Sequence, residues 1–242
     1  MEKKEIILGR NPVLEYLRSP RPGGRARLYV ARKAHGKIVD VIIQEARGRG
    51  IPVEYRDRDF FREYPEDNHQ GVLLIATHAE NPSDEESFLR DVVDAKGVLV
   101  LLDQITDPHN VGAIIRTAEA LGADAVVLPK AHSPEIGPTV IKASAGATAH
   151  IRIITVTNVA SFLDRLKGMG YWVVGTAADG NLPLTEASTV KPAVVVIGSE
   201  GQGMRRLTEE NCDYIVSIPL RGRISSLNAS VAAGIVLYEI LK

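Results

Sequence analysis

The second part of the chain alternates short apolar runs with longer stretches that mix apolar and polar residues. The apolar runs are 98–102 (VLVLL), 125–128 (AVVL), 172–175 (WVVG), 193–197 (AVVVI) and 214–217 (YIVS). The mixed stretches have helical character and cover 110–122, about 138–144, 158–169, 203–210 and 227–241. Because a strand buried on both faces reads as a continuous apolar run, this alternation predicts a parallel sheet with helices on both faces.

The first part of the chain predicts a smaller α/β unit. Asn11-Pro12 is a good helix start, because asparagine caps helices and proline suits the first helical turn. Residues 37–47 place apolar residues at helical spacing with charges between them, and Gly48 and Gly50 end that helix. Short strands are predicted at 28–30, 53–55 and 72–76.

A polar segment separates the two parts. Residues 79–87 (AENPSDEES) contain proline and serine and have no apolar period, which is typical of a linker. We therefore expect a first domain over 1–78, a linker over 79–94 and a second domain over 95–242.

Composition places the chain among globular proteins. Of its 242 residues 45% are hydrophobic and 24% are charged, which excludes a disordered, collagen-like or coiled-coil rod. No apolar run is long enough for a transmembrane helix, and the start MEKKEIILGR has no secretory signal. The single cysteine, Cys212, excludes an internal disulfide, and the six histidines lack metal-ligand spacing. We expect a reduced cytoplasmic protein with no metal and no membrane partner.

The net charge of −1 hides an uneven distribution. Residues 1–50 carry 12 Lys/Arg and 5 Asp/Glu, a net charge of +7, while the rest of the chain carries −8. Divided at the linker, residues 1–78 carry +4 and residues 79–242 carry −5. A basic part suggests a polyanionic partner, although a solvated basic surface explains the charge count equally well.

Ligands of open parallel sheets bind at the carboxyl ends of the strands, and three predicted strand ends carry unusual residues. The first is 103–112, which leads into a helix bearing Arg116. Asn110 can cap that helix, and Arg116, four residues after Gly112, can face the same cleft. A capped helix with an exposed arginine is the alternative.

The second strand end is the glycine-rich turn Gly198-Ser199-Glu200-Gly201-Gln202-Gly203. Its spacing, G-x-x-G-x-G, is neither the dinucleotide fingerprint nor a P-loop. Bare amides in such a turn can contact a ligand, but the carboxylate of Glu200 would repel a phosphate. It suits a ligand with a cationic centre, ribose hydroxyls or an arginine partner.

The third strand end is 217–230, a loop of proline, glycine, hydroxyl and amide residues before the last helix. Its serines and asparagine can cap that helix. The helix itself contains small residues that predict very close packing, and a tight subunit contact is one explanation: Ala229, Ala232, Ala233 and Gly234.

Together the three segments resemble the motifs of the SpoU (TrmH-type) family of RNA ribose 2′-O-methyltransferases, part of the SPOUT superfamily. The first motif is similar to Asn110-Val111-Gly112 through Arg116-Thr117, the second to 197–203, and the third to 218–220 with 226–230. The resemblance covers about residues 95–242. Residues 5–76 look like the small ribosomal-protein-like RNA-binding domain that precedes the catalytic domain in many members. Residues 107–110 and 203–208 look most like the branch that methylates a guanosine of large-subunit ribosomal RNA.

The resemblance implies a deep trefoil knot, a homodimer with the active site at the subunit interface, and S-adenosyl-L-methionine as cofactor. The residues that it implies for cofactor binding are Thr176, Gly198, Glu200, Gly201, Ile218, Leu220 and Leu227. Those that it implies for catalysis are Asn110, Arg116, Glu200, Ser226 and Asn228. For RNA binding we expect Arg10 and Arg32 in the first domain, and Arg221 and Arg223, which stand where the family often has small residues.

Methyl transfer to a ribose hydroxyl requires a group that helps the hydroxyl lose its proton or that stabilises the alkoxide. Arg116 is a poor base, because a guanidinium stays protonated in proteins. We interpret Arg116 as stabilising the alkoxide or holding the adjacent phosphate, with Glu200 orienting it. In the family this arginine is expected to act across the dimer interface.

Other functions remain open at this point. A transfer RNA 2′-O-methyltransferase would have the same three motifs, and a non-catalytic RNA-binding ribosome-assembly factor could have the same fold. The presence of Asn110, Arg116, Glu200 and Asn228 favours an enzyme. The glycine spacing argues against a dinucleotide oxidoreductase.

Overall fold

The computed structural model describes residues 2–19, 25–64, 69–79, 82–178, 180, 182–223 and 226–242. Its contacts divide the chain into two compact units. The first is Met1–Asn81 with Glu135–His150, and the second is Pro82–Pro134 with Ile151–Lys242. Within the described residues, none of the helices has the length and apolar character needed to cross a membrane.

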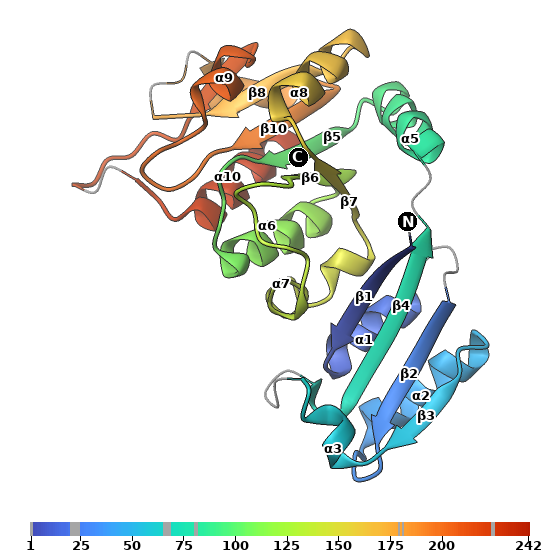
Figure 1. Ribbon diagram of the computed structural model, residues 1–242. Coiled ribbons are helices and arrows are strands. Elements are labelled where there is room, and N and C mark those ends of the chain that lie inside the picture. The colour runs from blue at the N-terminus through green and yellow to red at the C-terminus, as the bar shows by residue number, and fades with distance from the viewer. Residues whose placement is uncertain are drawn as a thin grey trace. The chain divides into compact units, whose positions relative to one another are not determined.

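The first unit is built on a four-stranded sheet in the order β1-β4-β2-β3. Its strands are β1 (Glu2–Leu8), β2 (Arg25–Ala31), β3 (Val53–Arg56) and β4 (Val72–Ala79). Strand β4 is antiparallel to β1 and β2, whereas β2 and β3 are parallel. Helices α1 (Arg10–Arg18) and α2 (Lys37–Gly48) cover one face of this sheet (Figure 1). The short helix α3 (Arg58–Phe61) supplies Phe61 to a smaller apolar cluster with Leu8 and Leu73.

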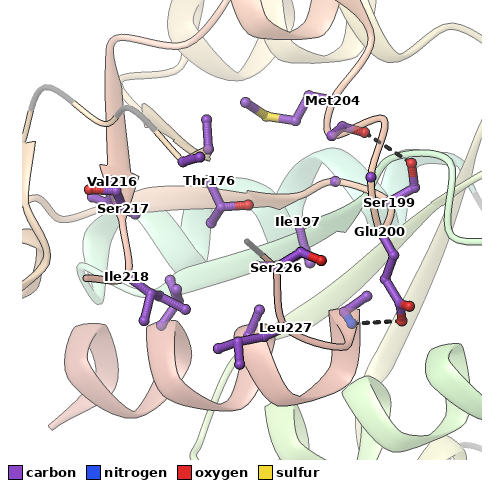
Figure 2. Close-up of a pocket in the computed structure, with 18 of the residues that line it drawn as sticks. Thr176, Ile197, Ser199, Glu200, Met204, Val216, Ser217, Ile218, Ser226 and Leu227 are labelled. Carbon is purple, nitrogen blue, oxygen red and sulfur yellow. Dashed lines mark hydrogen bonds between the residues drawn. The ribbon is translucent and has the colours of Figure 1, made fainter. Parts of the chain in front are cut away.

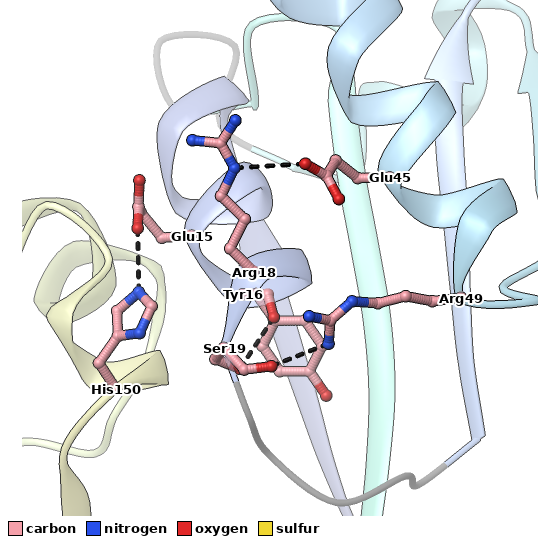
Figure 3. Close-up of polar contacts among 7 residues, drawn as sticks. All are labelled: Glu15, Tyr16, Arg18, Ser19, Glu45, Arg49 and His150. Carbon is pink, nitrogen blue, oxygen red and sulfur yellow. Dashed lines mark hydrogen bonds and ion pairs between the residues drawn. The ribbon is translucent and has the colours of Figure 1, made fainter.

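The segment Glu135–His150 belongs to the first unit although it lies far along the chain. Helix α7 (Pro138–Ala143) packs against β1, and the 3-10 helix η1 (Ala147–Ala149) packs against α1. Ile141 is only 1% exposed and belongs to the apolar cluster formed with residues of the sheet, α1 and α2. The His150 side chain meets α1, where its Nε2 lies 2.9 Å from Glu15 Oε2 (Figure 3). The first unit is therefore discontinuous in sequence.

The second unit is built on a seven-stranded sheet in the order β7-β6-β5-β10-β8-β11-β9. All neighbouring strands are parallel, which confirms the predicted sheet type. The strands are β5 (Val98–Leu102), β6 (Ala125–Pro129), β7 (Arg152–Val156), β8 (Trp172–Thr176), β9 (Leu182–Pro183), β10 (Ala193–Ile197) and β11 (Tyr214–Ser217). The trefoil knot implied by the resemblance stays a prediction.

Helices cover both faces of the parallel sheet. Helices α5 (Pro82–Asp94) and α8 (Val159–Gly168) share one apolar cluster with inward-facing strand residues such as Leu101 and Val196. Helices α6 (Pro108–Ala120) and α10 (Ala229–Leu241) pack against each other on the other side (Figure 1). The short helices η2 (Leu184–Thr189) and α9 (Arg206–Glu210) complete the unit.

Part of the segment expected to be a linker is a helix. Residues 80–81 lie outside the described residues, and α5 begins at Pro82. Leu89 is fully buried and Val92 is 3% exposed, and the Tyr171 hydroxyl donates a 2.7 Å hydrogen bond to the Leu89 carbonyl. The sequence pattern did not predict this helix, because its first turn is polar and its apolar positions begin only at Phe88.

Candidate cofactor and active site

A cavity of about 730 Å³ opens at the carboxyl ends of three strands of the parallel sheet. Thr176 ends β8, Ile197 ends β10 and Ser217 ends β11, and all three line it (Figure 2). The loops after β10 and β11 form further walls, and α10 contributes Ala229, Ala232 and Val236. The cavity thus lies at the edge where parallel sheets bind ligands.

The glycine-rich turn folds back on itself along one wall. The Ser199 and Gly203 backbones exchange two hydrogen bonds of 2.9 and 3.0 Å, so residues 199–203 form a closed loop. Gly198 has no room for a side chain, because an added Cβ would lie 2.4 Å from the Gly203 carbonyl carbon and 2.6 Å from the Met204 nitrogen. The Gly198 backbone therefore packs directly against the other arm of the turn.

Glu200 connects the glycine turn to the first and third motifs. Its Oε1 accepts hydrogen bonds from Asn110 Nδ2 at 3.2 Å, Asn228 Nδ2 at 2.6 Å and the Ala229 backbone at 2.9 Å (Figure 2 shows the last). Asn228 Nδ2 also donates to Asn110 Oδ1 at 3.0 Å. The carboxylate therefore sits at the N-terminus of α10, where negative charge is favourable.

A buried carboxylate fixes the far end of the same turn. Asp103, which follows β5, is fully buried, and its Oδ2 accepts a 2.8 Å hydrogen bond from the Arg205 backbone. The Arg205 side chain adds an ion pair, with Nε 3.0 Å from Asp103 Oδ1. Because a paired buried carboxylate is costly to disturb, the two contacts hold the end of the turn next to the first motif.

The residues expected to bind the cofactor lie together around the cavity. All of them line it: Thr176, Gly198, Glu200, Gly201, Ile218, Leu220 and Leu227. The Thr176 hydroxyl is held in place by donating to the Val196 carbonyl at 3.0 Å. Ser226 also lines the cavity, and residues 224–225 of the third-motif loop lie outside the described residues.

The arginines expected at the site are exposed, whereas the side-chain amides of Asn110 and Asn228 are held by Glu200. Arg116 lies on α6 with its side chain exposed, and it has no hydrogen-bond or ion-pair partner among the described residues. The expected orientation of Arg116 by Glu200 is thus not seen within this single chain. Arg221 and Arg223 are exposed and follow Leu220, which lines the cavity.

The two arginines expected to bind RNA in the first unit already have partners. Arg10 donates from Nε to the Gln70 carbonyl at 3.3 Å, and its backbone donates to Gln70 Oε1 at 3.2 Å. Arg32 Nε lies 3.1 Å from Asp57 Oδ1, and both side chains are well exposed. An exposed pair of this kind contributes little stability, so Arg32 remains able to exchange its partner.

The sequence did not single out every residue that lines the cavity. Glu209 on α9 and Val236 on α10 carry no local signal, because they reach the cavity only through the packing of their helices. Ala232 belongs to the small-residue pattern that the sequence linked to a subunit contact, yet it also lines the cavity.

Cys212 lies near the site but does not have the properties of a nucleophile. Burial raises the pKa of its thiol to about 12, and nearby Glu209 and Asp213 add to the shift. Its Sγ donates to the Thr208 carbonyl at 3.3 Å. In the part of the chain that the structure describes, no group of three metal-ligating side chains is found.

The fold and the cavity define an α/β protein with a ligand-sized cavity at the carboxyl edge of a parallel sheet. Comparison with known proteins identifies the family within this class. Residues 97–238 match the SpoU rRNA methylase family, and residues 6–82 match the domain described as RNA 2′-O ribose methyltransferase substrate binding. The chain therefore belongs to the SpoU rRNA methylase family.

Individual relatives and solved structures match this chain over nearly its whole length. The chain is 41% identical over 245 residues to the 23S rRNA (guanosine-2′-O-)-methyltransferase RlmB of Pseudomonas aeruginosa, covering 100% of this chain and 98% of that protein. Its structure is similar to the SpoU methyltransferase AviRb of Streptomyces viridochromogenes, with a TM-score of 0.80 at 25% identity, covering 98% and 88% of the two chains. An AdoMet-bound rRNA methyltransferase from Sinorhizobium meliloti has a TM-score of 0.76 at 25% identity, covering 98% and 86%.

Proposed function

We propose that this protein uses S-adenosyl-L-methionine to methylate the ribose 2′-oxygen of a guanosine in 23S ribosomal RNA. The family identifies an RNA methyltransferase, and the similarity to RlmB, over nearly the whole length of both chains, supports this substrate. The observation that carries the proposal is the cavity that the second and third motifs form at the carboxyl ends of β8, β10 and β11.

The chemistry of the cavity fits this cofactor. Its volume of about 730 Å³ is in the range of ligand pockets, which span roughly 300–1,000 Å³. The described residues that line it include Glu200 and Glu209 but no lysine or arginine. Carboxylates without cations favour a ligand with a positive centre, such as a sulfonium, over a phosphate-rich dinucleotide. Gly198, Gly201 and Gly203 all line the cavity, so its wall carries no side chains at these three positions.

The reaction places a different demand on each part of the site. When bound, S-adenosyl-L-methionine supplies an electrophilic methyl group, so the protein must position the ribose and stabilise its oxygen. Glu200 Oε1 accepts three hydrogen bonds, which hold Asn110, Asn228 and the start of α10. We assign Glu200 to fixing Asn110 and Asn228, whose amides, together with Ser226, then face the ribose.

Arg116 is the group that we assign to the developing alkoxide or to the adjacent phosphate. It is exposed and has no partner among the described residues, so its charge is available to a substrate. A fixed cation next to a developing negative charge lowers the barrier. We propose, as the family resemblance implies, that Arg116 acts in the active site of a second subunit.

A second subunit has a suitable surface on α10. Val231, Ile235 and Tyr238 are 51%, 40% and 63% exposed, and their spacing of four and three residues puts them on one side of the helix. A helix that is apolar on an exposed side favours contact with another protein surface. We therefore propose that α10 forms the homodimer interface. We propose the cytoplasm as the location, because ribosomal RNA is the substrate.

RNA contacts are proposed at both ends of the chain. Arg10 and Arg32 lie in the unit that matches the RNA substrate-binding domain, and Arg221 and Arg223 follow the cavity wall. Each cation that contacts a phosphate makes binding more sensitive to salt. Removal of any one of the four should therefore weaken RNA binding and lower its salt dependence.

The test is a methyl-transfer assay with radiolabelled cofactor on 23S ribosomal RNA that lacks 2′-O-methylation, followed by mapping of the methylated nucleotide. Arg116→Ala should reduce turnover by about 10²-fold or more, the typical cost of losing one transition-state donor, while cofactor affinity by calorimetry stays near normal. Arg90→Ala is the matched control, because Arg90 is an exposed helical arginine on α5 that forms an ion pair with Glu86. Turnover of Arg116→Ala equal to that of the control contradicts the assignment, and methylation of transfer RNA alone contradicts the substrate.

A further inference from the structure

The sheet of the first unit has one face that helices α1 and α2 leave open. These helices pack on the opposite face, where they enclose the larger apolar cluster (Figure 1). On the open face, a smaller cluster has only three fully buried members, Leu8, Phe61 and Leu73. The other apolar residues of that cluster are only partly buried. The open face therefore presents apolar surface next to solvent.

Three aromatic rings lie together on this face. The rings of Tyr29 on β2 and Phe60 on α3 have centroids 4.8 Å apart and are tilted by 33°. The Tyr64 ring lies 6.1 Å from Phe60. All three side chains are half-buried, in contrast to Phe61, which is 1% exposed and anchors α3. Each of the three residues therefore keeps some surface exposed to solvent.

Arginines surround these rings. The Arg56 guanidinium lies 5.8 Å from the Tyr29 centroid and 5.5 Å from the Phe60 centroid. Because side chains alternate along a strand, Arg25 and Arg27 are on the same side of β2 as Tyr29. We call Arg25, Arg27, Tyr29, Arg56, Phe60 and Tyr64 the aromatic–arginine face.

The charge of this face is positive. Glu54 makes ion pairs with both Arg27 and Arg56, so one carboxylate serves two guanidiniums, and Arg25 adds a further exposed cation. The three arginines and Glu54 therefore leave a net charge of +2. Beside them, Arg32 pairs with Asp57 and Arg62 pairs with Asp59, so these two ion pairs add no net charge.

We propose that the aromatic–arginine face binds unpaired nucleotides of single-stranded RNA, with bases on the rings and phosphates on the arginines. Proteins that bind single strands combine aromatic side chains, on which bases stack, with cations along the backbone. A purely apolar partner would bury Arg25, Arg27 and Arg56 with too few acceptors, at a high cost. A duplex does not fit, because its bases are stacked on one another and cannot reach the rings. The inference rests on the proposed RNA substrate and adds where and in which form that RNA is held.

The test uses the full-length protein and two labelled RNAs, a 12-nucleotide single strand and a blunt duplex of the same length, with affinity measured by fluorescence anisotropy. The double variant Tyr29→Leu/Phe60→Leu should weaken binding of the single strand by tenfold or more, since stacking is lost at two positions. Affinity for the duplex should change by less than twofold. Tyr55→Leu is the matched control, because Tyr55 is the neighbour of Arg56 on β3, is 45% exposed and points to the opposite face.

A second variant and a second measurement keep the test independent of stability. Arg56→Gln should reduce the slope of log affinity against log salt by about 0.7, the value for one phosphate contact to a single strand. In the unaltered protein, a photoreactive 4-thiouridine in the single strand should cross-link to peptides that contain 25–31 or 56–64.

Each alternative gives a distinct result. Unchanged affinity in the double variant, with cross-links elsewhere, overturns the proposal and leaves the face as a small packing cluster. A change in sedimentation of the double variant in the absence of RNA identifies a second copy of the chain as the occupant and also overturns it. Methyl transfer by the unaltered protein on ribosomal RNA is measured in parallel, so that failure of the proposed function is recognised separately.

Discussion

At the scale of single residues, Gly198 is defined by the space around it. An added Cβ would meet the backbone of Gly203 and Met204 at 2.4 and 2.6 Å, and backbone atoms cannot move aside as a flexible side chain can. Gly198→Ala should therefore displace the turn, destabilise the protein by about 1–3 kcal/mol and weaken cofactor binding by more than tenfold.

Calorimetric titration with S-adenosyl-L-methionine and thermal unfolding check this expectation. Gly168→Ala serves as the control, because Gly168 is the last residue of α8 and an added Cβ there meets nothing within 4 Å. Cofactor affinity of Gly198→Ala equal to that of the control would show that the turn tolerates a side chain.

Cys212 makes alkaline stability a measurable property of the fold. Its thiol has an ordinary pKa of 9.0 and a pKa of about 12 in the folded protein, mainly because of burial. Between about pH 9 and 12 the unfolded chain loses a proton that the folded chain keeps. The free energy of unfolding should then fall with pH, by up to about 1.4 kcal/mol per pH unit, the limit for one proton.

Urea unfolding at pH 8, 9, 10 and 11 measures this fall. Cys212→Ala should show a shallower fall over the same range, even if it starts from a lower stability. Burial raises the pKa of Tyr171 as well, but its contribution is present in both proteins and cancels in the comparison. Parallel curves would mean that Cys212 titrates alike in the folded and unfolded states.

At the scale of elements, α10 has two sides with different roles. Ala229, Ala232 and Val236 line the cavity, while Val231, Ile235 and Tyr238 are exposed on another side. Ile235→Lys should place a desolvated cation in the proposed dimer interface and convert the dimer to a monomer. Sedimentation velocity measures the change, and methyl transfer should fall with it, because Arg116 is proposed to act in the other subunit.

Leu207→Lys is the control for α10. Leu207 lies on α9 and is 56% exposed, so it introduces the same charge at another exposed apolar position. A dimer that persists in Ile235→Lys, or a monomer that keeps full activity, contradicts the assignment of α10.

Strands inside the parallel sheet could be predicted from the sequence, whereas its edge could not. Strands β5, β10 and β11 have the predicted bounds, because each is a continuous apolar run. Strand β7 was missed, since it is at the edge of the sheet and carries exposed Thr155. Strand β1 was missed because its first residues, EKKE, are charged, and α3 was missed because four residues give no helical period.

The motifs indicated residues that line the cavity. They did not indicate the tertiary contacts that hold the site together. The resemblance named Gly198, Ile218 and Leu227 as cofactor contacts, and all three line one cavity. The contact of Asp103 with Arg205 joins residues 102 positions apart, and no local pattern indicates it. Glu209 and Val236 reach the cavity through helix packing, which the sequence likewise does not encode locally.

At the scale of the whole molecule, the first unit depends on a segment that arrives late in the chain. Ile141 of α7 is 1% exposed within the core of that unit. Ile141→Ala in the full chain should destabilise the unit by roughly 2–5 kcal/mol and increase hydrogen exchange in β1 and α1. Thr139→Ala, an exposed position on the same helix, is the control. Exchange in β1 and α1 equal to that of the control would show that α7 adds nothing to this core.

The same discontinuity sets an order of events during synthesis. Residues up to Asn81 leave the ribosome first, but Ile141 of their apolar core follows about 60 residues later. At roughly 5–20 residues per second, that core stays incomplete for several seconds. A nascent chain stalled near residue 125, which has exposed its first 81 residues, should therefore be cleaved by protease within them faster than one stalled near residue 190, where Glu135–His150 has also emerged.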